Sequence, residues 1–443
     1  MSKKTKLIPE LRFPEFVDEG EWEEKKLIET TEERVKWSFA GGPFGSNLKA
    51  TDYTKEGIRI IQLQNIGDGE FNDDYKIYTS EEKANELLSC NIYSGEIILS
   101  KMGDPVGRAC IIPDILKRCV MASDGIRLVV DEKRYSKYFI YSLINSIHIR
   151  TAIEKKATGS TRKRIGLDEL KAVKLIIPQK LEQQKIASCL SSLDEMIADQ
   201  GQKLDLLKDH KKGLMQKLFP QEGEKVPKYR FKEFEKDGEW VEKKIIETTD
   251  KKIKWSFTGG PFGSNLKASD YTTEGIRIIQ LQNIGDGEFN NEYKIYTSKE
   301  KADELLSCNI YSDEIILSKM GDPVGRACII PSYLNRCVMA SDGIRLVVDE
   351  KKYSKYFIYS IINSKQIREA IEKKSTGSTR KRIGLDELKG IELMIPNTIK
   401  EQQKIASCLS SLDALITAQT EKIEQLKLHK KGLMQGLFPK IND

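Results

Sequence analysis

The chain has 443 residues, which is enough for two to four domains with ordinary hydrophobic cores. It contains no run of about 18 apolar residues and does not open with a basic segment followed by an apolar one, so we expect neither a membrane span nor a secretory signal. The net charge of +6 is too small to indicate a nucleic-acid partner by itself, so any basic binding surface has to be local.

Residues 1–178 form the first of four predicted parts, and their short β-rich runs and turns indicate a compact α+β domain. Helices are expected near 80–89 and near 136–156. Runs rich in isoleucine, valine and leucine predict strands at 57–66, 96–100, 109–112 and 126–130. The glycines and the proline between the second and third of these strands indicate a tight turn from Lys101 to Arg108.

Residues 179–220 form the second part, where the hydrophobic period becomes that of a coiled coil. Apolar residues recur in alternating steps of four and three, at Ile186, Leu190, Leu193, Ile197, Leu204, Leu207, Leu214 and Leu218. Pro178 precedes this helix and Pro220 stops it. About 38 residues at about 1.5 Å each predict a rod of roughly 57 Å, and its narrow apolar seam needs a partner helix.

Residues 221–396 and 397–443 repeat the first two parts. The segment from Gly41 to Ala50 returns unchanged from Gly259 to Ala268. A period this long indicates a duplicated domain, because solenoid units run only about 20–50 residues. A whole domain separates the two helices, so we expect them to form an antiparallel coiled coil with a globular domain at each end, in pseudo-two-fold symmetry. Duplex DNA is the commonest partner with two-fold symmetry of its own.

Polar residues interrupt the predicted seam at matching places in both helices. Gln200 and Gln419 fill one seam position, and Lys211 and Lys430 fill another. Such residues can fix the register and the number of paired helices at some cost in stability. The alternative is that the helices splay apart there and water solvates these side chains.

The residues that usually carry catalysis are missing or are not duplicated. The eight cysteines form no Cys-x-x-Cys pair, which favours buried free thiols in a reducing cytoplasm over a metal site. His148 is replaced by Gln366 in the second copy, and His210 and His429 lie on the predicted helices. The chain has no phosphate-binding loop, dinucleotide fingerprint, amino-methyltransferase motif or nucleophile–base pattern, so we expect no catalytic residue, metal or cofactor on it.

Four places in each copy suit contact with DNA. The first is the loop from Gly159 to Arg164, where a small polar turn and three cations suit phosphate oxygens, although it could be a solvated charge run. The second is the segment from Gly41 to Asn47, whose glycines permit close approach and whose Ser46 and Asn47 could reach base edges. A purely structural loop is the alternative there.

The third place is the turn that carries Lys101 and Arg108, and the fourth is the amide group of Gln62, Gln64 and Asn65. Amides are the natural readers of adenine, and alternation along a strand would put Gln62 and Gln64 on one face, where they could equally face solvent. The candidates in the first copy are Gly41, Gly42, Ser46, Asn47, Gln62, Gln64, Asn65, Lys101, Arg108, Ser160, Thr161, Arg162, Lys163 and Arg164. Those in the second copy are Gly259, Gly260, Ser264, Asn265, Gln280, Gln282, Asn283, Lys319, Arg326, Ser378, Thr379, Arg380, Lys381 and Arg382.

Several motifs together resemble one protein family over the whole chain, in the order domain, rod, domain, rod. They are Leu11-Arg12-Phe13-Pro14-Glu15-Phe16 with Glu21-Trp22, the Thr158-Gly159-Ser160-Thr161 loop, Glu182-Gln183-Gln184-Lys185-Ile186-Ala187, Gly213-Leu214-Met215-Gln216, and the counterparts of each in the second copy. This pattern resembles the specificity subunits of type I restriction-modification systems.

The resemblance implies that each recognition domain reads one half of a bipartite DNA site in adjacent major grooves. It further implies that the helices set the spacer and hold two methyltransferase subunits, which carry S-adenosylmethionine and methylate adenine. Motor-nuclease subunits would join for restriction and use ATP and Mg²⁺, in the cytoplasm of a bacterium or archaeon. This chain would then be a non-catalytic DNA-recognition subunit. The alternative is a stand-alone two-domain DNA-binding or scaffold protein.

The chain departs from the family pattern because its two recognition domains nearly coincide, whereas the two usually differ. Differences such as Ile147-His148 against Lys365-Gln366 fall outside all four candidate places. Identical loops should read identical bases. We therefore predict that the target is an interrupted palindrome, with one half-site read twice on opposite strands.

Overall fold

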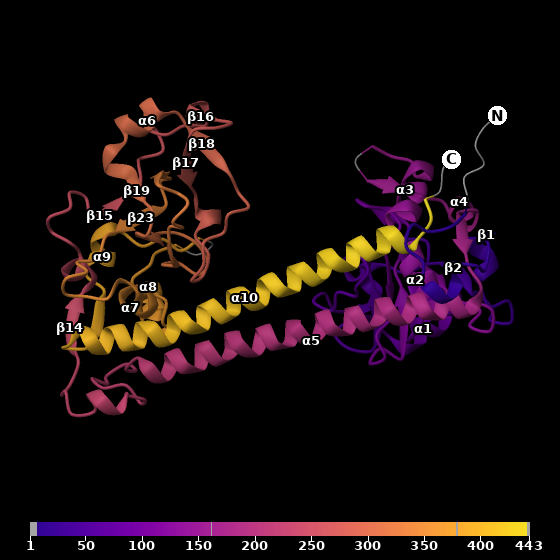
Figure 1. The fold of residues 1–443 in the computed structure, drawn as a ribbon, viewed down its shortest axis with the longest axis horizontal. Helices are drawn as coiled ribbons and strands as arrows, with labels where there is room; N and C mark the ends of the chain where they lie inside the picture. Colours follow the sequence, from indigo (N-terminus) through magenta and orange to yellow (C-terminus); the bar gives the residue numbers. More distant parts are fainter. Residues whose placement is uncertain (1–6, 161, 378–379, 441–443) are drawn as a thin grey trace. The chain divides into compact units, whose positions relative to one another are not determined.

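The computed structural model describes residues 7–160, 162–377 and 380–440, and the chain divides into two compact units. Unit 1 comprises Met1–Gly201 with Glu421–Asp443, and unit 2 comprises Gln202–Thr420. Both boundaries fall inside the long helices α5 (Lys180–Leu218) and α10 (Ile399–Leu437), as the colours along the chain in Figure 1 allow the reader to follow. Each unit therefore holds one repeated domain and a part of each long helix.

Unit 1 begins with short strands, and its helices lie mainly in the later part of the domain. Its strands are β1 (Glu23–Lys26), β2 (Phe39–Gly41), β3 (Tyr53–Thr54), β4 (Ile58–Ile61), β5 (Ile77–Thr79), β6 (Asn91–Tyr93), β7 (Ile97–Ser100), β8 (Met102–Gly103), β9 (Ala109–Ile111), β10 (Arg118–Met121), β11 (Gly125–Leu128), β12 (Lys163–Arg164) and β13 (Lys174–Ile177). Its short helices are α1 (Glu81–Glu86), α2 (Lys137–Ile144), α3 (Ile147–Lys156) and α4 (Leu167–Lys171).

Unit 2 repeats this series except for the counterparts of β8 and β12. Its strands are β14 (Val241–Lys244), β15 (Phe257–Gly259), β16 (Tyr271–Thr272), β17 (Ile276–Ile279), β18 (Ile295–Thr297), β19 (Asn309–Tyr311), β20 (Ile315–Ser318), β21 (Ala327–Ile329), β22 (Arg336–Met339), β23 (Gly343–Leu346) and β24 (Glu392–Ile395). Its short helices are α6 (Lys299–Glu304), α7 (Lys355–Ile362), α8 (Lys365–Lys373) and α9 (Leu385–Lys389).

Both units have the same larger sheets, which confirms the predicted α+β class and the duplication. The β8–β12 pair of unit 1 is reduced to a single bridge between Met320 and Arg382 in unit 2. In unit 1 the sheets run in the orders β3-β5-β4-β10-β6 and β2-β11-β7-β9, and β1 pairs with β13. In unit 2 the matching orders are β16-β18-β17-β22-β19 and β15-β23-β20-β21, and β14 pairs with β24. The pairing of β4 with β10 is parallel, with Ile60 opposite Val120, so the ends of these two strands meet at one edge.

The core of each domain packs helices against the sheet that contains β7 or β20, and it also takes in the start of one long helix and the end of the other. In unit 1 the ring of Phe139, on α2, lies 5.6 Å from the ring of Phe438, which follows α10. In unit 2 the ring of Phe357, on α7, lies 5.7 Å from the ring of Phe219, which follows α5. All four rings are at most 1% exposed, so burying the helix ends stabilises the domains.

Helix α5 fills nearly all of the predicted 179–220, whereas α10 ends at Leu437, short of the predicted 443. Within each unit a part of one long helix pairs with a part of the other. In unit 1 Lys430 Nζ of α10 lies 2.5 Å from Asp194 Oδ1 of α5, and in unit 2 Lys211 Nζ of α5 lies 2.5 Å from Asp413 Oδ1 of α10. The start of each helix thus pairs with the later part of the other, as an antiparallel pair requires. The seam lysines therefore have carboxylate partners across the pair, which favours register fixing over solvation for these two positions. Among the helices that the described residues form, none is long and apolar enough to cross a membrane.

Two predicted elements are wrong in detail. The helix expected near 136–156 is two helices, because Asn145 turns its amide to the backbone of Ala109 and Ser146 caps α3 through Ile149 N. The strand expected at 57–66 ends at Ile61 and is followed by a 3₁₀ helix, Leu63–Asn65. Gln62 and Gln64 therefore do not alternate along a strand.

Candidate functional site

A polar cleft in unit 2 brings together all four predicted contact places of the second copy. It has a volume of about 690 Å³, and its lining includes Gly263, Gln280, Gln282, Arg326 and Arg380. These residues lie up to 117 positions apart in the sequence. The fold therefore joins four separate sequence patterns into one surface.

The polar cleft of unit 1 is smaller, about 220 Å³, and is lined by Gly45, Gln62, Gln64 and Asp124, among others. The remaining two places reach the same region. Strand β12, in the basic loop, pairs antiparallel with β8, in the turn after Lys101, and Arg164 Nη2 lies 3.4 Å from Asp124 Oδ1. The same convergence therefore occurs in both copies.

The loop from Gly41 to Asn47 is fixed to the sheet at its base. Gly42 N donates to Gly125 O at 2.8 Å, and a Cβ at Gly42 would lie 1.8 Å from Ala122 O. Gly260 makes the same approach to Ala340 O in unit 2. Glycine is therefore required at these two positions because the loop packs too closely against the sheet for any side chain. Beyond this base, Ser46 and Asn47 are exposed, as are Ser264 and Asn265.

One predicted group of residues has to be corrected. Asn65 is completely buried, its Nδ2 donates to Asn72 O at 2.8 Å and to Tyr75 O at 2.9 Å, and its Oδ1 accepts from Gln62 N. Asn283 makes the same bonds in unit 2. These two amides hold the loop together and are not available to a ligand.

The glutamines of the same group remain at the surface of the polar cleft. Gln64 and Gln282 are exposed, and Gln62 is half-buried with its Nε2 3.3 Å from the hydroxyl of Tyr53. The amides of Gln64 and Gln282 therefore present both a donor and an acceptor to the cleft.

Arg108 and Arg326 end the predicted turn in their copies, and Arg326 lines the polar cleft of unit 2. Arg108 Nη2 makes one long contact, 3.5 Å to Leu63 O. The Nε of each is buried and has no hydrogen-bond partner within the part of the chain that the structure describes. Lys101 and Lys319 are half-buried at the start of the same turns. Unused guanidinium donors at a cleft suit an anionic or strongly accepting ligand.

The basic loop is a small hairpin whose cations have different partners. Thr158 and Arg164 exchange backbone hydrogen bonds of 2.8 Å, and Gly159 adopts a φ of 104°, which favours glycine. Lys163 forms an ion pair with Glu154, and Arg164 faces Asp124. Arg162 is exposed and forms no ion pair with any residue that the structure describes.

The second basic loop repeats this arrangement. Lys381 pairs with Glu372, Arg382 Nη2 lies 3.4 Å from Asp342 Oδ1, and Arg380 is exposed at the polar cleft. Ser160 is exposed in the first loop. The predicted contacts Thr161, Ser378 and Thr379 lie outside the described residues.

The sequence reasoning missed several residues of the cleft region. Phe44 and Phe262 are each 83% exposed at the tips of their loops, although both lie inside the segments that were predicted to contact DNA. Tyr53 and Asp124 also line the cleft of unit 1. The position of each phenylalanine between a proline and a glycine could have indicated an exposed ring in a turn. No neighbouring residues indicated that Tyr53 or Asp124 would line the cleft.

Two further features of the described residues concern possible metal ligands and thiols. Within the described ranges, His, Cys, Asp and Glu side chains form no group of three or more that could hold a metal ion. Cys110 and Cys119 lie in the apolar layer between the sheets, where burial raises the pKa of each thiol to about 12. These thiols stay protonated near neutral pH, so they are poor nucleophiles and poor ligands.

Comparison with known proteins adds a family to this geometry. The model of the type I restriction modification DNA specificity domain matches residues 59–209 and again residues 269–428. The MjaX protein of Methanocaldococcus jannaschii, provisionally named a type I restriction enzyme specificity subunit, is 26% identical over 396 residues, which cover 87% of each chain. The EcoBI specificity subunit of Escherichia coli is 22% identical over 412 residues, covering 89% of this chain and 82% of that one.

A solved structure supports the fold. The type I restriction-modification system S subunit from M. genitalium has a TM-score of 0.53 to this chain at 17% identity, covering 98% of this chain and 100% of that chain. At this identity the likeness concerns the fold. The doubled match of the family model agrees with the duplication observed in the sequence and in the two units.

Proposed function

Because this chain belongs to the type I restriction modification DNA specificity family, we propose that each of its repeated domains reads one half of a bipartite DNA site through its polar cleft. The chain acts as the DNA-recognition component, and the stand-alone alternative is not favoured by relatives that match along most of the chain. Both half-sites have the same sequence in this proposal, because the cleft residues are the same in both copies.

The convergence of four segments at each polar cleft is the observation that carries this proposal. Exposed amides of Gln64 and Gln282 suit the donor and acceptor pattern of adenine in the major groove. Arg162 and Arg380 suit phosphate oxygens beside it. The cleft thus combines groups that read bases with groups that position the backbone.

The catalytic steps belong, in this proposal, to partner subunits. Two methyltransferase subunits bring S-adenosylmethionine and methylate adenine, and motor-nuclease subunits bring ATP and Mg²⁺. The complex works in the cytoplasm. Purified alone with DNA and these cofactors, the chain should neither methylate nor cleave.

Mapping methylated adenines in the host genome tests the proposed function. We expect one interrupted palindrome to carry methyl groups on both strands, and deletion of the gene for this chain to remove them. Two unrelated half-sites would contradict the proposal of one sequence read twice.

The double variant Arg162→Ala with Arg380→Ala should weaken DNA binding by the assembled enzyme and reduce its salt dependence. Each lost phosphate contact lowers the slope of log affinity against log salt by about one, so the double variant should lose about two. The measurement is DNA affinity at several salt concentrations.

The matched control is Lys163→Ala with Lys381→Ala, because these lysines are already paired with Glu154 and Glu372 in the same loops. It should change the slope less than the arginine variant does. A slope that stays unchanged in the arginine variant would remove the basic loop from the interface.

A further inference from the structure

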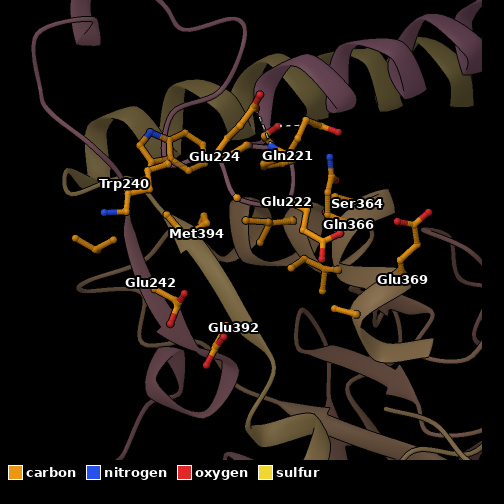
Figure 2. Close-up of a pocket in the computed structure, with 18 of the residues that line it drawn as sticks. Gln221, Glu222, Glu224, Trp240, Glu242, Ser364, Gln366, Glu369, Glu392 and Met394 are labelled. Carbon is orange, nitrogen blue, oxygen red and sulfur yellow. Dashed lines mark hydrogen bonds between the residues drawn. The ribbon is translucent and has the colours of Figure 1, made fainter. Parts of the chain in front are cut away.

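We propose that unit 2 contains a binding site for a small organic cation, an ammonium or guanidinium group carried on an apolar chain, in a second cavity that is separate from the polar cleft. This cavity, called the acidic cavity below, has a volume of about 660 Å³ and lies where α5 ends, against α7, α8 and the pair β14–β24 (Figure 2). Its size falls in the range of small-molecule sites, about 300–1,000 Å³. The proposal does not depend on how the domains read DNA.

The apolar part of the lining suits a hydrocarbon chain. Phe219, Trp240, Ile367 and Met394 line the cavity, and the first two are at most 2% exposed. The indole nitrogen of Trp240 donates to Glu401 at 3.1 Å, so the polar atom of this side chain already has a partner. The rest of the indole ring is left as an apolar surface.

The charged part of the lining is strongly acidic. It contains six glutamates against two lysines, Lys225 and Lys373. Both lysines are already engaged, Lys373 with Glu222 at 3.3 Å and Lys225 with Glu239 at 3.1 Å. Of the other four carboxylates, Glu369 pairs with Lys365 at 3.8 Å and Glu224 accepts a hydrogen bond from Gln221 N. The excess of negative charge that a cation would offset therefore lies mainly on Glu242 and Glu392.

A comparison with unit 1 shows where this excess arises. In unit 1 Lys174 of β13 forms an ion pair of 2.8 Å with Glu24 of β1. In unit 2 the same two places hold Glu392 of β24 and Glu242 of β14, which Figure 2 shows extending from their strands. An exposed ion pair has thus been replaced by two exposed like charges, and a bound cation could take the place of the missing lysine.

Buried polar atoms without partners also line the acidic cavity. Ser364 is 2% exposed, and its Oγ makes no hydrogen bond with the residues that the structure describes. Its counterpart Ser146 accepts from Ile149 N at the start of α3, whereas Ser364 does not cap α8. The amide oxygen and nitrogen of Gln366 are likewise buried and unpaired in the described part of the chain. A buried polar group without a partner is costly, so a ligand that bonds to these atoms would stabilise the site.

The acidic cavity belongs to unit 2 and is not duplicated in its chemistry. Three of its residues, Gln366, Glu369 and Glu392, correspond to His148, Thr151 and Lys174 in unit 1. These differences lie outside the polar clefts, which are the same in both copies. We infer that the second copy has acquired a ligand site whose three distinguishing residues the described part of the first copy does not share.

An organic cation on an apolar chain could be supplied by a free polyamine or by lysine side chains of a partner polypeptide. Calorimetric titration of the full chain with spermidine and with the peptide acetyl-Lys-Leu-Lys-Leu-amide distinguishes these sources. We expect saturable binding of at least one probe at one site per chain. Tighter binding of spermidine assigns the free polyamine, and tighter binding of the peptide assigns the polypeptide source.

The decisive variant replaces the three residues by their unit 1 counterparts, Gln366→His with Glu369→Thr and Glu392→Lys. Because unit 1 carries these residues in the same fold, the variant should keep its structure, and binding should weaken by about tenfold or more. The variant Glu274→Thr with Glu292→Lys makes the same change in net charge outside the cavity and should bind as the parent chain does. Absence of saturable binding by either probe, or equal binding by the triple variant and the parent, would overturn the proposal.

Discussion

Replacing Glu401 with alanine should lower the free energy of unfolding of unit 2 by about 3–5 kcal/mol, because it leaves a buried guanidinium without its carboxylate. Arg230 donates from Nε and Nη2 to the two carboxylate oxygens of Glu401, both at 2.8 Å. The two side chains are 7% and 0% exposed, and Trp240 also donates to Glu401. Removing Glu401 therefore breaks three charge-assisted bonds at once.

Chemical denaturation of the full chain, followed by circular dichroism, measures this loss. The control is Glu233→Ala, which removes the partner of Lys404 at 3.2 Å in a pair whose side chains are both about half exposed. Exposed pairs contribute little, so the control should unfold close to the parent chain. Equal destabilisation by both variants would show that burial of the Arg230–Glu401 pair does not matter.

The same pair exists in unit 1, where Arg12 makes two bonds of 2.8 Å to Glu182. Two of the motifs that carry the family resemblance, the opening of the domain and the start of the long helix, are therefore partners of each other. Their residues lie about 170 positions apart. The sequence displayed both motifs, but it held no information that one binds the other.

The elements that depend on local pattern were predictable. The heptad spacing and the flanking prolines placed α5 and α10 correctly, because helix ends and seams are encoded by neighbouring residues. Elements that depend on distant partners were not. The break at Asn145 follows from its hydrogen bonds to Ala109, which lies 36 residues earlier in the chain.

The candidate site shows the same division. The loops that meet at each polar cleft could be predicted from their residue types, because glycines and amide and cationic side chains suit contact with DNA wherever they lie. Exposure could not be predicted in the same way. Asn65 and Gln64 both carry an amide, but the amide of Asn65 is buried and bonds to the carbonyl groups of Asn72 and Tyr75. Phe44, by contrast, is an apolar residue that the fold leaves exposed.

Placing alanine at Gly42 and Gly260 together should greatly weaken sequence-specific DNA binding. The added Cβ would lie 1.8 Å from Ala122 O or Ala340 O, and a backbone oxygen held in the sheet cannot move aside cheaply. Overpacking of this kind typically costs about 1–3 kcal/mol, so displacement of both loops should reduce affinity by roughly 10- to 100-fold or more. The measurement is binding of the assembled enzyme to its methylated site.

The control is Gly45→Ala with Gly263→Ala, in the same loops, where an added Cβ meets no atom within 4 Å. Because Gly45 and Gly263 line the polar clefts, their added methyl groups reach no protein atom and can meet only bound DNA. This variant should therefore lose less affinity than the Gly42 and Gly260 variant, and thermal unfolding should separate loop displacement from loss of the fold. Similar binding by the two double variants would remove the loops from the recognition surface.

The duplication makes the single variants informative as well, because Gly42→Ala and Gly260→Ala each distort one of two identical loops. If one half-site is read twice, the two single variants should lose the same affinity, whereas unequal losses would mean that the copies read different bases despite their identical loops.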